Sequence, residues 1–196
     1  MHEILSIFIK LVVITISYLL GCVCFAYYIT LVFHKKDIRM MGSGNVGSSN
    51  VGRQFGIPWF IPVLALDALK GFIVVMFFQY IELDLFIKLS SMLAVIIGHI
   101  WPVQLSFNGG KGLATVMGVA LGFDYLIVLG CCIVAGLCYL LISRSNAGLI
   151  ISVCFIPVFV WLLGYPLEEI LTFIAMALLM IFAHRNNILV FLQNKF

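Results

Sequence analysis

Long apolar runs dominate this sequence and constrain its fold more than any other feature. The first run extends from about residue 4 to residue 33 and contains one charged residue, Lys10. A membrane core about 30 Å thick needs roughly 20 apolar residues per helix, and further runs of similar length follow this one. Because 64% of the residues are hydrophobic and only 10% are charged, the sequence predicts an integral membrane protein.

Polar and turn-forming residues divide the chain into seven apolar segments. We expect an all-α fold with seven transmembrane helices, since an open sheet edge cannot be satisfied in hydrocarbon. The first run is too long and too weakly basic for a cleaved signal peptide, so we interpret it as the first span. The fourth segment is short for a full span and is expected to be tilted or partly re-entrant. The segments lie at about residues 4–33, 58–80, 86–105, 111–123, 125–143, 147–164 and 167–183.

Lysine and arginine gather in alternate connections between these segments. Positive residues in short loops mark the cytoplasmic side of a membrane protein. We therefore expect the N-terminus outside, the C-terminus in the cytoplasm, and a single polytopic domain over residues 1–196. Its cytoplasmic loops are expected near residues 34–57, 104–112, 143–148 and 184–196. The basic residues on that side are Lys35, Lys36, Arg39, Arg53, Lys111, Arg144, Arg185 and Lys195.

The first cytoplasmic loop contains GSGNVG at residues 42–47, which satisfies the dinucleotide-binding pattern G-x-G-x-x-G. That pattern is meaningful only after a strand and before a helix within a βαβ unit. Here it follows the basic segment HKKDIRM at the end of an apolar run. No parallel sheet can be built from this sequence, so a nucleotide-binding turn is excluded.

The same loop has the chemistry of an anion receptor. Glycine admits positive φ and lets successive N–H groups, here around Gly44 and Gly47, point into one concavity. Arg53 adds a planar guanidinium that matches phosphate or carboxylate. The alternative is a flexible connection, since loops are commonly rich in glycine. Further side-chain donors come from Ser43, Asn45, Ser49 and Asn50.

A second loop of this kind, SFNGGKGLAT, occupies residues 106–115. It resembles a P-loop, but Leu105 and Gly112 stand where that motif needs glycine and serine or threonine. Gly109, Gly110 and Gly112 surround Lys111 just before an apolar run. A helix N-terminus with free N–H groups favours an anion, so this loop predicts a second anion site on the same membrane face. The two loops would hold either two phosphates or one phosphate from both sides.

The third polar cluster, AHRNNI at residues 183–188, follows the last apolar segment. His184 and Asn187 are three residues apart and would share a face on a continuing helix, which suits hydroxyl recognition. Arg185 would turn away and mark the cytoplasmic end of the helix.

Two further features lie within apolar segments. Asp67 and Lys70 can pair at i, i+3, and a structural pair is favoured over a catalytic role. His99, in GHIWP, is expected to bond a backbone carbonyl freed near Pro102. The six cysteines lie in apolar runs, where they are expected to pack as small hydrophobic residues. No metal spacing is found among them.

In this order the three clusters resemble the PlsY family, the bacterial membrane glycerol-3-phosphate acyltransferases that use acyl phosphate. That family carries a serine-glycine-asparagine loop ending in arginine, a Gly-Gly-Lys-Gly loop and a final His-Arg-x-Asn element. The matching stretches here are SGNVGSSNVGR, GGKG and HRNN, with LDALKG and GHIWP as further matches. The resemblance covers nearly the whole chain.

This resemblance implies a multi-pass enzyme of the bacterial cytoplasmic membrane that acts as a monomer, with no cofactor, no metal and no nucleic acid. It would transfer an acyl group from acyl phosphate to the 1-hydroxyl of sn-glycerol 3-phosphate, giving lysophosphatidic acid and phosphate. Ser43, Arg53 and Lys111 would bind phosphate, and His184 and Asn187 would hold the glycerol end. Lys111, His184 and Asn187 would be the catalytic residues. The first loop would be shaped by Asn45, Ser49 and Asn50.

Some positions depart from the family pattern. Asn108 replaces a lysine, Asn186 replaces a glutamate, and SRSNAGLI at residues 143–150 keeps Arg144 but lacks the usual tyrosine and serine. Ser48 and Ser49 stand where the family has alanine and threonine. A related acyltransferase with a different phosphorylated acceptor is therefore one alternative. A small transporter is another, since it also uses broken helices and intramembrane charges. Against the transporter, no internal repeat is found and the polar residues gather on one membrane face.

Overall fold

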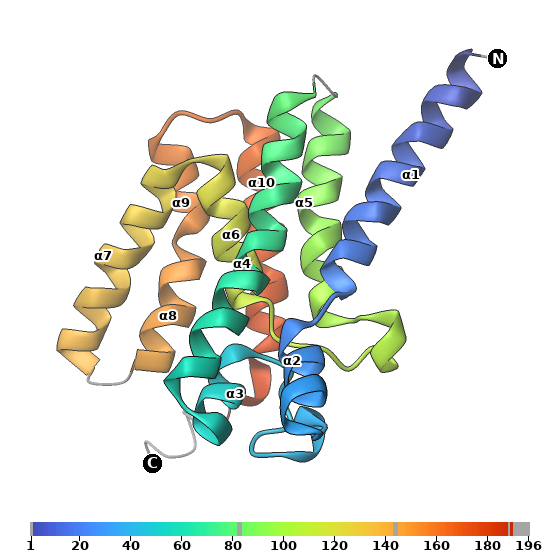
Figure 1. Cartoon of the computed structure of the whole chain (residues 1–196). Coiled ribbons are helices and arrows are strands. Elements are labelled where there is room, and N and C mark those ends of the chain that lie inside the picture. The colour runs from blue at the N-terminus through green and yellow to red at the C-terminus, as the bar shows by residue number, and fades with distance from the viewer. Residues whose placement is uncertain (1, 82–83, 143–144, 188, 190–196) are drawn as a thin grey trace. The chain divides into compact units, whose positions relative to one another are not determined.

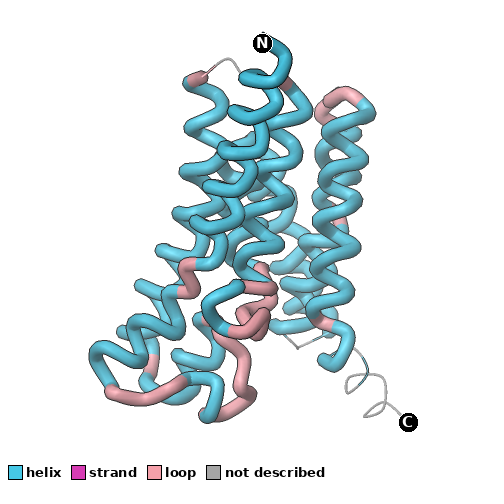
Figure 2. Tube along the Cα trace, turned by 90° about the vertical axis from the view of Figure 1, so that its right-hand side faces the viewer, coloured by secondary structure: helices cyan, strands magenta, loops and turns pink. Residues whose placement is uncertain are grey.

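The computed structural model describes residues 2–81, 84–142, 145–187 and 189, and all regular elements in these ranges are helical (Figure 2). The chain divides into two compact units, Met1–Phe123 and Asp124–Phe196. The helices of the first unit are α1 (His2–Cys22), α2 (Phe25–His34), α3 (Ser48–Phe55), α4 (Ile57–Tyr80), α5 (Leu85–Ile100) and α6 (Leu113–Phe123), with 3-10 turns η1 (Ile38–Met40) and η2 (Val103–Leu105) (Figure 1).

The first apolar run, which we interpreted as the first span, consists of two helices, α1 and α2. α1 and α2 meet at a bend of 42°. Lys70 Nζ donates to the carbonyls of Gly21 and Val23 at 3.0 and 2.9 Å. The side-chain amide of Gln104 donates to the carbonyl of Cys22. A membrane helix can break where other groups satisfy the freed carbonyls, and here the donors come from distant parts of the chain.

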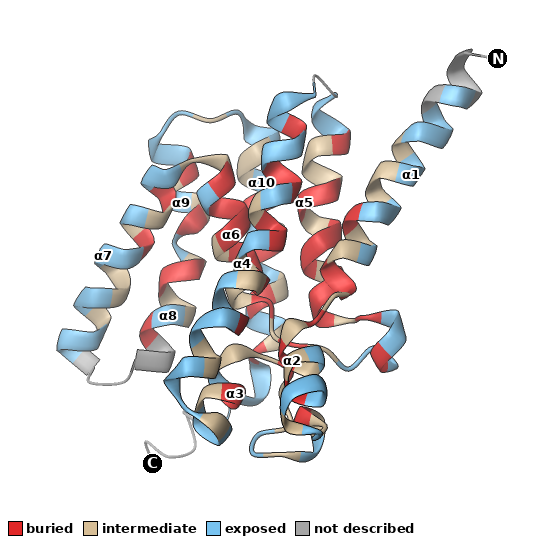
Figure 3. Ribbon diagram, in the orientation of Figure 1, coloured by how far each residue is buried: buried red, intermediate tan, exposed pale blue. Residues whose placement is uncertain are grey.

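Close helix packing builds the rest of the first unit. α1 packs against α5, and α4 packs against α5 and α6. A Cβ atom at Gly118 of α6 would overlap the backbone of Ala68 in α4, and one at Gly98 of α5 would overlap the carbonyl of Tyr18 in α1. Small residues let membrane helices approach this closely. Buried residues accordingly gather along α5, α6 and part of α4 (Figure 3).

In the described part of the second unit, the helices are α7 (Tyr125–Ile142), α8 (Ser145–Cys154), α9 (Ile156–Leu162) and α10 (Leu167–Ala183). α7 packs against α8, and α10 packs against α8 and α9. Pro157 lies in the first turn of α9, where its missing N–H does no harm, and it ends the preceding helix. The Tyr165 hydroxyl donates to Asp124 Oδ2 at 3.0 Å.

The lengths of these helices partly match the expected spans. α4 and the segment Leu85–Leu105 are long and apolar enough to cross a membrane, and the bent α1–α2 pair makes a third candidate. Shorter apolar helices lie at Leu113–Phe123, Tyr125–Leu141 and Gly148–Leu162. The fourth predicted segment is confirmed as short. It corresponds to α6, which has 11 residues, or about 16 Å of helix.

The cysteines were expected to pack as small hydrophobic residues, and three of them are buried. Cys22, Cys24 and Cys131 are buried, and all six cysteines are free thiols. The Cys24 thiol donates to the carbonyl of His99, and the Cys131 thiol donates to the carbonyl of Ser152.

The α4–α6 contact gives a stability test. Gly118→Ala is expected to lower the free energy of unfolding by about 1–3 kcal/mol, because the new methyl group overlaps the Ala68 backbone. Gly136→Ala in α7 is the control, since a Cβ there meets no atom within 4 Å. Alanine favours a helix over glycine, so this control should be neutral or stabilising. Thermal unfolding in detergent measures both, and equal midpoints would contradict the close packing.

Candidate active site

The first glycine-rich loop turns sharply between η1 and α3. Gly42 and Gly44 adopt φ values of 56° and 69°, which glycine reaches without strain. Gly47 is extended and caps the start of α3. This loop therefore has the backbone geometry that the sequence predicted for its first two glycines, and α3 begins directly after it.

Asn50 holds the first loop from inside. It is fully buried, and its Oδ1 accepts from the backbone N–H of Ser43 at 3.2 Å. Its Nδ2 donates to the carbonyls of Ile38, Met41 and Asn45 at 3.3, 2.9 and 3.1 Å. The side-chain amide is thus committed to the loop backbone. Asn50 was expected from the sequence among the donors of the anion-receptor loop, and in the structure its fully buried side chain shapes that loop by bonding its backbone.

Ser43 and Arg53 come together, although ten positions separate them. Arg53 lies in the last turn of α3, is exposed, and donates from Nη2 to Ser43 Oγ at 3.2 Å. In the described part of the chain Arg53 forms no ion pair. Its guanidinium and the Ser43 hydroxyl are therefore placed to act on the same anion.

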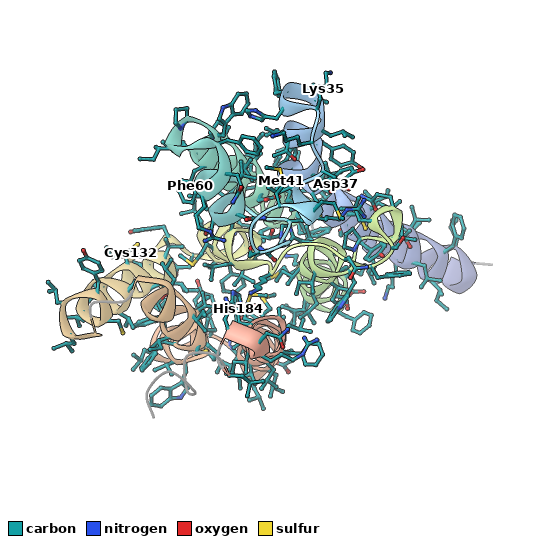
Figure 4. All side chains as sticks on the ribbon, turned by 90° about the horizontal axis from the view of Figure 1, so that it is seen from below. Lys35, Asp37, Met41, Phe60, Cys132 and His184 are labelled. Carbon is teal, nitrogen blue, oxygen red and sulfur yellow. The ribbon has the colours of Figure 1, made fainter. Side chains whose placement is uncertain are left out.

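Arg39, in the same stretch of chain, is already engaged. Its guanidinium makes a two-pronged contact with Asp37, the shortest distance being 2.7 Å, and lies 5.0 Å from the centre of the Tyr27 ring. These hydrogen bonds hold the pKa of Asp37 below its usual value. Figure 4 shows Asp37 and Met41 on either side of η1, with Lys35 farther out at the end of α2.

The second glycine-rich loop folds back onto the end of α5. The N–H groups of Gly109 and Gly110 donate to the carbonyls of Ile100 and His99 at 3.1 and 3.0 Å. A Cβ atom at Gly110 would overlap both the His99 ring and the carbonyl of Val46 in the first loop. The two loops therefore touch at Gly110, where only glycine fits. Lys111 follows this contact, and Gly112, with φ of 82°, leads into α6.

Lys111 and Arg53 lie close enough for their charges to interact, and we refer to the two residues as the cationic centre. Burial is the main cause that lowers the pKa of Lys111, and the positive charge of Arg53 lowers it further. Two cations that repel each other in a half-buried place are stabilised by a bound anion. The sequence predicted two anion sites on one membrane face, and the structure brings a basic residue from each loop together.

Asn50 provides a test of how the first loop is held. Asn50→Ala is expected to lower the free energy of unfolding by about 1–3 kcal/mol, because four hydrogen bonds from a buried side chain to the loop backbone are lost. Asn108→Ala is the matched control, since Asn108 is exposed and bonds only Ser106. That control is expected within about 0.5 kcal/mol of wild type in a thermal unfolding assay. An equally small effect for both variants would contradict the supporting role of Asn50.

The third cluster begins where the last predicted segment ends. α10 ends at Ala183 and His184 is its C-cap, so His184 and Asn187 do not lie on one uninterrupted helix. Residues 185–187 are helical again. His184 is buried, and its Nδ1 lies 2.9 Å from the carbonyl of Met180. Because a carbonyl only accepts, Nδ1 carries the proton, and Nε2 of the neutral ring is the basic nitrogen.

Arg185 keeps the role expected of it at the helix end. Its guanidinium donates to the carbonyl of Phe182 at 3.0 Å and lies 4.3 Å from the centre of the Phe182 ring. Asn187 is exposed. Residues 143–144, 188 and 190–196, which include parts of two expected loops, lie outside the described residues.

The buried charges form a larger cluster than the sequence indicated. The Asp67–Lys70 pair is confirmed at 2.9 Å, with both side chains almost fully buried. His99 was expected to bond a carbonyl, and this was wrong: its Nδ1 lies 2.7 Å from Lys70 Nζ. Spacing on one helix identified the pair, but no sequence signal linked it to a histidine on α5. Within the described residues, no group of three His, Cys, Asp or Glu side chains could hold a metal ion.

Comparison with known proteins identifies the family. The family model for glycerol-3-phosphate acyltransferase matches residues 11–194. The chain belongs to the glycerol-3-phosphate acyltransferase family. A member of this family, glycerol-3-phosphate acyltransferase 1 of Bacillus thuringiensis subsp. konkukian, is 35% identical over 170 residues, covering 87% of this chain and 93% of the relative. The family member from Ehrlichia canis is 36% identical over 183 residues, covering 93% of this chain and 95% of the relative.

Solved structures of the family have the same fold. A crystal structure of PlsY, an integral membrane glycerol 3-phosphate acyltransferase, in its glycerol 3-phosphate form has a TM-score of 0.87 and 32% identity, covering 94% of this chain and 92% of that one. The lysophosphatidic acid form of PlsY has a TM-score of 0.84 and 31% identity, again covering 94% of this chain and 92% of that one. The resemblance drawn from the three clusters is thereby confirmed.

Proposed function

We propose that this chain is a membrane-embedded enzyme that transfers a fatty acyl group from acyl phosphate to the 1-hydroxyl of sn-glycerol 3-phosphate. The products are lysophosphatidic acid and inorganic phosphate. Family membership supports acyl transfer to glycerol 3-phosphate. The glycerol 3-phosphate and lysophosphatidic acid forms of the related PlsY structure support the acceptor and the product. The acyl phosphate donor rests on the resemblance of the three motifs to the PlsY family.

The meeting of Arg53 and Lys111 carries this proposal. Both proposed substrates contain phosphate, and a guanidinium beside an ammonium is suited to neutralise it. Ser43 adds a hydroxyl that already contacts Arg53. The N–H group of Gly112 and the side chains of Asn45 and Ser49 are the further candidates for phosphate contacts, whereas the N–H of Gly44 already donates to the carbonyl of Met41 at 2.9 Å. No metal or cofactor is required for this charge neutralisation.

Acyl transfer from acyl phosphate requires little from the protein beyond positioning of the two substrates. The acceptor hydroxyl oxygen attacks the acyl carbon, the bond from that carbon to the phosphate oxygen breaks, and inorganic phosphate leaves. Acyl phosphate is a mixed anhydride with a good leaving group. Orientation of the two substrates and stabilisation of the departing phosphate by Lys111 and Arg53 are therefore the main contributions of the enzyme.

His184 is proposed to act on the acceptor hydroxyl. With its Nδ1 proton held by the Met180 carbonyl, the neutral ring has its basic nitrogen at Nε2. This nitrogen accepts the proton of the attacking hydroxyl, or the phosphate of the acceptor accepts it instead. Asn187 is proposed to bond the glycerol hydroxyls. Both roles come from the family resemblance.

The same proposal includes the membrane topology. The bent α1–α2 pair, α4, α5, α6, α7, the α8–α9 pair and α10 account for seven spans, with the N-terminus outside and the C-terminus in the cytoplasm. The basic loops support this orientation by the positive-inside rule. We place the enzyme in the bacterial cytoplasmic membrane as a single polytopic domain that acts as a monomer.

The alternative acceptor rests on Asn108 and Asn186, which replace charged residues of the family pattern. The transporter alternative loses support from the family match, since the matched relatives are acyltransferases. The dependence of phosphate release on the acceptor distinguishes glycerol 3-phosphate from another phosphorylated acceptor. Phosphate release only when glycerol 3-phosphate is present supports the proposal, whereas release only with another phosphorylated acceptor would favour the alternative.

The cationic centre gives the central activity test. With palmitoyl phosphate and glycerol 3-phosphate, Lys111→Ala and Arg53→Ala are each expected to lower kcat/KM about 10²–10³-fold, because the leaving phosphate loses a charged partner. His184→Ala is expected to lower kcat about 10²-fold or more through the loss of a general base. Phosphate release and lysophosphatidic acid formation by the purified protein measure these effects.

Arg39→Ala is the matched control for this test. Arg39 lies in the same basic stretch but is paired with Asp37, so its loss should leave kcat/KM within about twofold of wild type. Equal losses in the Arg39 and Arg53 variants would mean that overall positive charge, and not the cationic centre, supports turnover.

The lowered pKa of Lys111 predicts the alkaline limb of the pH profile. The protonated amine binds phosphate, so kcat/KM falls as pH rises through this pKa, and the fall begins at a lower pH than for an ordinary lysine. Lys111→Arg should remove this limb, because a guanidinium stays protonated. The control is Lys36→Arg at an exposed position, where the profile should not change. An unchanged alkaline limb in Lys111→Arg would contradict the assignment.

A further inference from the structure

A buried ionic cluster lies directly behind the second glycine-rich loop. Its members are Asp67 and Lys70 from α4 and His99 from α5, and their side chains are 2%, 1% and 4% exposed. Buried charges within a membrane protein are costly and commonly mark a functional requirement. The proposed chemistry uses none of these three residues.

The ammonium of Lys70 is the centre of this cluster. It lies 2.9 Å from Asp67 Oδ1 and 2.7 Å from His99 Nδ1, and it also donates to the carbonyls at the α1–α2 break. An ammonium has only hydrogens to offer, so His99 Nδ1 must accept. The His99 ring is then neutral, with its proton on Nε2. This contact fixes which edge of the ring faces α4 and which edge faces away.

The other edge of the His99 ring meets the second loop. A Cβ atom on Gly110 would overlap His99 Nε2 and the carbonyl of Val46, so the ring fills the space beside Gly110. The carbonyl of His99 also accepts the N–H of Gly110 at 3.0 Å. His99 therefore contacts Gly110 through its ring and through its backbone. Lys111 is the next residue in the chain.

We infer that His99, oriented by Lys70 and Asp67, is a positioning residue that sets the placement of Lys111 through Gly110. The inference rests on the proposed function, since it concerns how Lys111 is presented to phosphate. Charged groups act on a substrate only when neighbouring side chains lock them in place. The cluster supplies that support from the membrane-embedded side of the loop, and Gly110 transmits it.

The variant His99→Asn distinguishes the positioning role of His99 from an effect on protein stability alone. The Asn Oδ1 can take the place of Nδ1 as acceptor for Lys70, but the smaller side chain leaves the space beside Gly110 empty. Gly110→Ala disturbs the same junction from the other side without removing any polar group. Each variant is expected to weaken the binding of inorganic phosphate about tenfold, since a hydrogen bond to a charged group is worth about that much. A thermal-shift titration of the purified protein with phosphate measures the dissociation constant.

Gln79→Met is the matched control. Gln79 also lies on α4, and its side-chain amide donates to the carbonyl of Gly122 in α6 at 2.9 Å, a hydrogen bond that involves neither loop. This variant should lower the melting temperature and leave the phosphate dissociation constant unchanged. A weakened phosphate affinity in Gln79→Met as large as that in His99→Asn would overturn the inference, because any loss of stability would then act in the same way.

A double variant tests the route through Lys111. If His99 acts through Lys111, phosphate binding by His99→Asn/Lys111→Ala should be no weaker than by Lys111→Ala alone. Fully additive losses would overturn the inference, as would an unchanged affinity in both His99→Asn and Gly110→Ala. If Lys111→Ala itself bound phosphate like wild type, the proposed phosphate role of Lys111 would fail. If Lys111→Ala were weakened and His99→Asn were not, the inference alone would fail.

Discussion

The first unit depends on one buried ammonium, that of Lys70. In hydrocarbon, a freed carbonyl or an unpaired charge costs several kcal/mol, so a broken helix needs donors from elsewhere. Lys70 supplies them to Gly21 and Val23, neutralises Asp67, and orients His99. The break between α1 and α2, the helices α4 and α5, and the second glycine-rich loop therefore meet at a single charged group.

The two glycine-rich loops obtain their rigidity in different ways. The first loop is held by the side-chain amide of Asn50, which bonds four backbone groups. The second is held by the His99 carbonyl and ring against Gly110. In both loops the residues proposed to meet substrate, Arg53 and Lys111, stand beside the supporting groups. Buried amides and rings thus fix the backbone next to the charged side chains that we propose to contact phosphate.

Much of this structure was predictable from local patterns. The boundaries of α10 agree with the predicted segment 167–183, and the Asp67–Lys70 pair followed from its i, i+3 spacing. The features that the sequence did not indicate have a different origin. The first apolar run has no proline to mark the bend between α1 and α2. The partner of His99 lies on another helix, and His184 is the C-cap that ends α10. Each of these depends on contacts or caps that local propensity does not encode.

By itself the sequence determined the helical membrane class and the positions of the two glycine-rich loops, because hydrophobic length and glycine-rich motifs are local properties. It also determined the family, through three motifs in a fixed order. Only the tertiary structure decided that the charges of Arg53 and Lys111 interact and which backbone groups of the first loop Asn50 bonds. It alone placed Lys70 at the helix break and His99 behind Gly110. These arrangements join residues far apart in the chain, and the need to satisfy every buried polar group selects them.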